Sequence, residues 1–89
     1  MNVAHYLEQH AAADPERIAI RFEGNSTTYG QLNRAANQLA AGLRSAGIAA
    51  GDRVALYLPN LPAFVVAYYA TQKLGAVPVT INAILKTEI

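Results

Sequence analysis

Two histidines, His5 and His10, are the only imidazoles in the chain, and an imidazole can bind a metal ion or carry a proton. Metal ligands on one helix are usually spaced three or four residues apart, so that they share a face. These two are five residues apart, and no third ligand lies near them in the sequence. We therefore interpret both as surface histidines.

The carboxylates are the next candidates, because two of them held close together can act as general acid and general base. Only Asp14 and Glu16 are close in sequence, and they flank Pro15 in a turn pattern. That pattern favours solvated turn residues over an acid–base pair. The carboxylates of the chain are Glu8, Asp14, Glu16, Glu23, Asp52 and Glu88.

Nucleophiles and phosphate-binding loops are equally scarce. The chain has no cysteine, and neither Ser26 nor Ser45 lies in the Gly-x-Ser-x-Gly turn of a catalytic serine. Ser26 fits a turn and Ser45 fits a helix surface. The six glycines form neither a Walker A sequence nor a Gly-x-Gly-x-x-Gly motif.

Asn60, Tyr68 and Tyr69 could still face a ligand. Asn60 lies between an expected strand and an expected helix, where α/β proteins place ligands, but asparagine is also among the best helix caps. We favour the cap for Asn60 and a place in the core for the two tyrosines. The sequence therefore predicts no catalytic, cofactor-binding or metal-binding residue.

Composition excludes several other classes of protein. The 89 residues are 53% hydrophobic and 15% charged, which is the reverse of a disordered chain. A net charge of +1 with scattered basic residues argues against a nucleic acid partner. The longest apolar run, Leu61–Ala70, is shorter than the roughly 20 residues of a transmembrane helix. Without cysteines or a signal-peptide pattern, we expect a cytoplasmic location.

The first half of the chain predicts a helix, a hairpin and a second helix. Asn2 is expected to cap a helix that ends near Ala13, and residues 17–23 alternate like a half-buried strand. We expect a Gly24-Asn25 turn and a return strand beginning at Ser26. Thr28 and Gln31 match a capping box, opening a helix that stops at Gly47. Its expected buried stripe is Leu32, Ala36, Leu39 and Leu43.

The second half predicts a parallel strand–helix–strand unit, which makes the fold class α/β. The run Val54–Leu58 is apolar without alternation, typical of a strand covered on both faces. A helix capped by Asn60 should follow and end at Gly75, before a strand over Val77–Ile81. Thr87–Ile89 looks like the start of another helix, so we expect residues 1–89 to be a truncated segment of something larger.

Several blocks, in order, resemble the N-terminal part of adenylate-forming enzymes. Residues 13–20 resemble an ADPERIAI opening, residues 28–40 a TYxELxxxxNxLAxxL helix, and residues 47–56 a GVxxGDRVAL turn and strand. Residues 59–70, 73–79 and 81–82 complete the series. The stretch from Lys73 to Asn82 is shorter than the KAGAAYVPLDP of nonribosomal adenylation domains. With Leu85–Ile89 after it, this stretch is similar to acyl-CoA synthetases, the fatty-acid–CoA ligases especially.

The resemblance implies a two-step ligase as the parent protein. A carboxylic acid, expected to be a fatty acid, would react with ATP in the presence of Mg²⁺ to give an acyl-adenylate, and coenzyme A would then displace AMP. The phosphate loop and the catalytic lysine of the family lie downstream of this stretch. We therefore expect the segment to be inactive by itself and to hold none of these cofactors.

Two alternatives stay open. The chain could be a stand-alone interaction module derived from such an enzyme, or a segment of an aryl- or amino-acid-activating adenylation domain.

Packing leads to one further expectation. The helix over Leu61–Ala70 is apolar all round, and such a helix is normally buried on all sides. Because the chain has little else to cover it, we expect the isolated segment to self-associate through this helix or the Val54–Leu58 strand.

Overall fold

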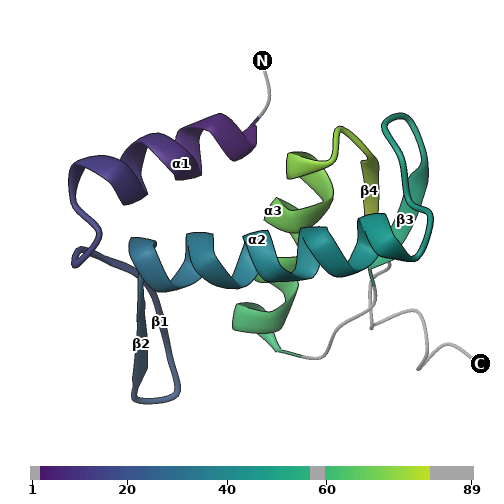
Figure 1. Ribbon diagram of the computed structural model, residues 1–89. Helices are drawn as coiled ribbons and strands as arrows, with labels where there is room; N and C mark the ends of the chain where they lie inside the picture. Colours follow the sequence, from purple (N-terminus) through teal and green to yellow (C-terminus); the bar gives the residue numbers. More distant parts are fainter. Residues whose placement is uncertain (1–2, 57–59, 81–89) are drawn as a thin grey trace, which may run out of the picture.

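The computed structural model describes residues 3–56 and 60–80. Its elements are α1 (Val3–Ala13), β1 (Ile18–Phe22), β2 (Asn25–Thr28), α2 (Tyr29–Ser45), β3 (Arg53–Leu56), α3 (Leu61–Lys73) and β4 (Val77–Thr80). This order confirms the predicted α/β class, with an antiparallel hairpin followed by a parallel unit (Figure 1). Four predicted features lie outside the described residues: the cap at Asn2, the end of the strand at Leu58, the strand residue Ile81 and the helix start at Thr87–Ile89.

The hairpin turns one residue earlier than the sequence analysis predicts. Phe22 pairs with Asn25, so the two turn residues are Glu23 and Gly24, not Gly24 and Asn25. Both turn residues have positive φ, 52° and 82°. A two-residue turn of this kind matches the right-handed twist of the flanking strands, and glycine adopts its second position without strain.

Helix α2 begins and ends as predicted. The Gln31 backbone N–H donates to Thr28 Oγ1 at 3.1 Å, and the Thr28 backbone N–H donates to Gln31 Oε1 at 2.9 Å. At the other end, Gly47 has φ 101° and the Ile48 N–H donates to the Leu43 carbonyl at 3.0 Å, as in a Schellman motif. Both ends of α2 are therefore fixed by local chemistry.

The predicted stripe of α2 is only partly correct. The buried residues are Leu32, Ala36 and Ala40, whereas Leu39 is 37% exposed. Leu39 and Ala40 lie on opposite sides of Ala36 around the helix, and the buried contact with α3 lies on the Ala40 side. A small alanine at this position also lets the neighbouring helix come close.

The core lies where α2 meets α3, with α1 and the hairpin closing one end. In Figure 1, α2 runs across the front of the molecule and α3 crosses behind it. Buried alanines from both helices occupy the contact, and Leu7 from α1 and Ile20 from β1 complete it. The buried core cluster is Leu7, Ile20, Leu32, Ala36, Ala40 and Ala70.

The parallel unit is covered on one face within the described residues. Strands β3 and β4 pair in parallel through the crossover helix α3. Val54 is half-buried and Leu56 is buried, but Ala55 between them is exposed. The described elements place a helix on one face of β3 only, so the described residues do not supply the second cover that the sequence pattern is typical of. Within the described ranges, no helix is long and apolar enough to cross a membrane.

Candidate functional site

The two histidines lie apart and have different surroundings. His5 is exposed on α1. His10 is half-buried between two aromatic rings, with its centroid 4.3 Å from that of Tyr6 and 5.0 Å from that of Tyr29. Among the described residues, no three His, Cys, Asp or Glu side chains are grouped to hold a metal ion. His10 is thus a packing residue that joins α1 to the start of α2, not the surface residue that was predicted.

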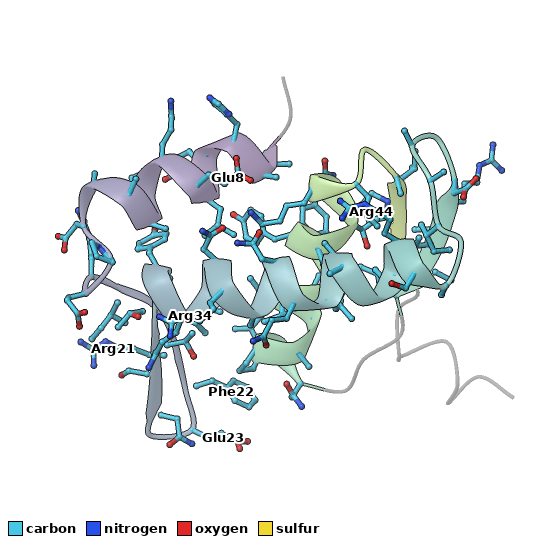
Figure 2. The ribbon with its side chains drawn as sticks, in the orientation of Figure 1. Glu8, Arg21, Phe22, Glu23, Arg34 and Arg44 are labelled. Carbon is cyan, nitrogen blue, oxygen red and sulfur yellow. The ribbon has the colours of Figure 1, made fainter. Side chains whose placement is uncertain are left out.

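The carboxylates form no acid–base pair in the part of the chain that the structure describes. Asp14 and Glu16 are exposed around their proline. Asp52 Oδ2 accepts a hydrogen bond from the Ala49 N–H at 2.8 Å, which closes the turn before β3. Glu8 on α1 and Glu23 at the hairpin tip lie in separate parts of the fold (Figure 2). Glu88 lies outside the described residues.

The polar candidates with hydroxyl or amide groups serve the backbone or face solvent. Asn60 Oδ1 accepts from the Ala63 N–H at 2.9 Å, so Asn60 is the cap of α3 as predicted. Ser26 is exposed on β2, and Ser45 is exposed at the end of α2. Neither serine has a base beside it among the interactions of the described residues. The described part of the chain therefore supplies no activated nucleophile.

One ion pair was not foreseen from the sequence. Lys73 Nζ lies 2.7 Å from Glu8 Oε2, joining the end of α3 to the middle of α1. The Lys73 side chain is 6% exposed and that of Glu8 is 48% exposed. The two residues are 65 positions apart, so no local pattern could have shown the contact.

A concave feature on α3 is lined by apolar and aromatic side chains. A hollow of about 260 Å³ is lined by Phe64, Val65, Tyr68 and Tyr69 on α3. The rings of Phe64 and Tyr68 are 6.3 Å apart and stacked. Burial raises the pKa of the Tyr69 hydroxyl above its usual value, and the neighbouring tyrosines Tyr29, Tyr6 and Tyr68 add to the effect. The predicted place in the core is only partly correct, because both tyrosines are half-buried and only Tyr69 packs against the buried core cluster.

The described residues do not fit Mg²⁺ or a nucleotide phosphate. The glycines with positive φ are Gly24, Gly47, Gly51 and Gly75, and each ends or joins a different element rather than forming one loop. No cluster of metal-ligating side chains accompanies them in the described ranges. What this part of the molecule offers is apolar contact surface on α3 and on the parallel strands.

Comparison with known proteins gives a consistent result. The model of a family described as AMP-binding enzyme matches residues 7–88. The chain is 42% identical to a feruloyl-CoA synthase of an Amycolatopsis species over 74 residues, which are 83% of this chain and 15% of that protein. It is 45% identical to pyochelin synthase PchD of Pseudomonas aeruginosa over 78 residues, 88% of this chain and 14% of that protein.

A solved structure extends the likeness to three dimensions. A fatty acyl CoA synthetase of Mycobacterium tuberculosis superposes with a TM-score of 0.85 and 42% sequence identity, covering 91% of this chain and 16% of that one. The chain thus spans only 14–16% of the length of these three proteins.

Proposed function

This chain belongs to the AMP-binding enzyme family, and from that premise we propose that it is the N-terminal segment of an AMP-forming acyl-CoA ligase. The parent would join a carboxylic acid to coenzyme A at the expense of ATP. The observation that carries the proposal is the superposition on a fatty acyl CoA synthetase over 91% of this chain. The feruloyl-CoA synthase relative supports the same class of reaction.

The segment itself contributes structure rather than chemistry. Its histidines, carboxylates and serines are packing, turn, ion-pair or solvent-exposed residues, and its side-chain hydrogen bonds close helix caps and a turn. We therefore propose that residues 1–89 form one part of a larger domain and are inactive alone. A cytoplasmic location and a role in fatty acid metabolism stay predictions.

A second candidate, an adenylation domain that activates an aryl or amino acid, is favoured by two comparisons. Pyochelin synthase PchD is 45% identical to this chain, and an adenylation–PCP di-domain NRPS from Klebsiella oxytoca superposes on it with a TM-score of 0.88 and 29% identity. Both candidate enzymes first form an adenylate of their acid. They differ in which acid is activated and in which thiol accepts the acyl group.

An ATP–pyrophosphate exchange assay tests the proposal. The 89-residue chain should show no carboxylate-dependent exchange, and robust exchange would contradict its inactivity.

Reading the gene beyond the codon for Ile89 tests whether the parent protein is a ligase of this family. A Thr/Ser/Gly-rich phosphate loop within roughly the next hundred codons is expected, in line with the motif order of the family. Its absence would count against a ligase.

We also propose that the isolated chain self-associates. The hollow on α3 is lined by four large apolar or aromatic side chains that nothing in the described residues fully covers. Exposed apolar surface of this kind favours association in water. Sedimentation equilibrium at micromolar concentration should give a mass above 9.5 kDa. A monodisperse monomer would show that the exposed face of α3 is tolerated in water.

A further inference from the structure

Helix α1 places little apolar side-chain volume in the interior. Its buried side chains are Ala4 and Leu7, and of these only Leu7 belongs to the buried core cluster. Residues 14–17, which follow the helix, are all exposed. In Figure 1, α1 lies along one side of α2, near the C-terminal end of α3. We call α1 the strap, and the other described helices and strands the body.

The connection that follows the strap is held by the body. Two backbone N–H groups in the first turn of α2 donate to the Pro15 and Arg17 carbonyls, at 3.0 and 2.9 Å. The Asp14 N–H instead donates back to the His10 carbonyl of the strap at 3.0 Å. The bond from the Arg17 N–H to the Asp14 carbonyl spans the two parts and is longer, at 3.2 Å. A hinge between Asp14 and Pro15 therefore leaves the other three hydrogen bonds intact.

The ion pair between Glu8 and Lys73 joins the strap to the body. Glu8 Oε2 lies on the strap, 2.7 Å from Lys73 Nζ at the end of α3. With the strap in place, the Lys73 side chain is 6% exposed. An ammonium group withdrawn from water in this way depends on its counter-charge. Glu8 therefore stabilises the closed strap, whereas an open strap returns both ions to water.

The contact between the strap and α2 leaves one polar group unsatisfied. His10 of the strap stacks on Tyr29, with ring centroids 5.0 Å apart. Asn33 is four residues beyond Tyr29 and shares its face of α2. The Asn33 side-chain oxygen is buried and has no hydrogen-bond partner among the described residues. A buried acceptor without a partner favours any state in which water reaches it, and opening the strap uncovers this face.

We propose that the strap opens as a unit while the body stays folded, and that the Glu8–Lys73 pair keeps it closed. Segments with few buried apolar contacts open at a lower free energy than global unfolding requires. Opening uncovers the Lys73 ammonium, so the chain has a closed state that hides this cation and an open state that presents it. This opening does not depend on the reaction that the parent protein catalyses.

Native-state hydrogen exchange of the 89-residue chain, followed by NMR, tests the proposal. The hydrogen-bonded amides of the strap should exchange at least about tenfold faster than the slowest amides of α2 and α3. Their exchange should also depend less steeply on low concentrations of urea, because opening the strap exposes less surface than global unfolding. A single class of amides with one common urea dependence would overturn the proposal.

A variant of the body separates opening of the strap from global unfolding. Asn60→Ala removes the cap of α3 at the end away from Lys73. It should lower the protection of the slowest α2 and α3 amides about fivefold and leave the strap amides unchanged, because the cap is present whether the strap is open or closed. An equal loss of protection in the strap would show that it opens only when the body unfolds, which overturns the proposal.

A variant of the strap tests the role of the ion pair. Glu8→Ala should lower the protection of the strap amides roughly 30-fold, because it leaves the Lys73 ammonium without its counter-charge in the closed state. Gln9→Ala, at the exposed neighbouring position, should change this protection by less than about threefold. Unchanged protection in Glu8→Ala would overturn the role of the pair. Protection of the strap that rises with protein concentration would show that a second copy holds it closed, and the proposal would fail.

Discussion

The ion pair between Glu8 and Lys73 should respond asymmetrically to the loss of either partner. Lys73 is 6% exposed, so removing the carboxylate of Glu8 leaves an ammonium group with little water and no counter-charge. Glu8 is 48% exposed, so removing Lys73 returns its carboxylate to solvent at little cost. The more exposed residue of the pair is therefore the more costly one to replace.

The magnitude follows from the burial of each partner. Breaking a fully buried pair costs about 3–5 kcal/mol, and the half-exposed carboxylate reduces this, so we expect about 2 kcal/mol for Glu8→Ala. Lys73→Met keeps the apolar stem and removes the charge, so its cost should stay below about 1 kcal/mol. Adding Lys73→Met to Glu8→Ala should recover stability, because the stranded ammonium is then absent.

Urea unfolding followed by circular dichroism at 25 °C gives the free energy of unfolding for each variant, at several protein concentrations to account for association. Gln9→Ala is the control, since Gln9 is the exposed neighbour of Glu8 on α1 and undergoes a similar change in helix propensity. The reasoning is refuted if Lys73→Met costs more than Glu8→Ala. It is equally refuted if the double variant is no more stable than Glu8→Ala.

Three further predictions concern single groups. Thr28→Ala removes the capping hydrogen bond to Gln31 and should lower the free energy of unfolding by about 1 kcal/mol in urea titrations, with Ser26→Ala near neutral. Gly42→Ala, in a helix with open space around it, should raise the melting temperature, whereas Gly24→Ala, at φ 82°, should lower it, each by an amount equivalent to about 1 kcal/mol. Burial raises the pKa of Tyr69, so its contribution to stability is complete below pH 10.0, the ordinary tyrosine pKa, and is lost as the pH rises through the folded-state pKa. Tyr69→Phe should flatten this alkaline fall in a pH series of urea titrations.

Local signals predicted most of the fold, because they depend on residues that are close in sequence. The capping box at Thr28 and the cap at Asn60 act within a single turn of helix, so their residue types were sufficient. The hairpin turn was misplaced by one residue because Gly24 can occupy either position of the turn. Only the strand pairing of Asn25 decides between the two.

Contacts between distant elements were beyond the sequence patterns. The pairing of Glu8 with Lys73 depends on how α1 crosses α3, and the stacking of His10 on Tyr29 depends on how α1 meets α2. The coverage of β3 also depends on parts of the fold that no local pattern specifies.

The alanine-lined contact between α2 and α3 has a consequence for sequence variation. Ala36, Ala40 and Ala70 are all at most 4% exposed, so the two helices meet with little side-chain volume between them. A larger side chain at any of these positions would push the helices apart, because packed interiors have no spare space to absorb it. In natural variants of this segment, the residue types on the solvent side of α2 should therefore vary freely. At these three positions they should be restricted to glycine, alanine and serine.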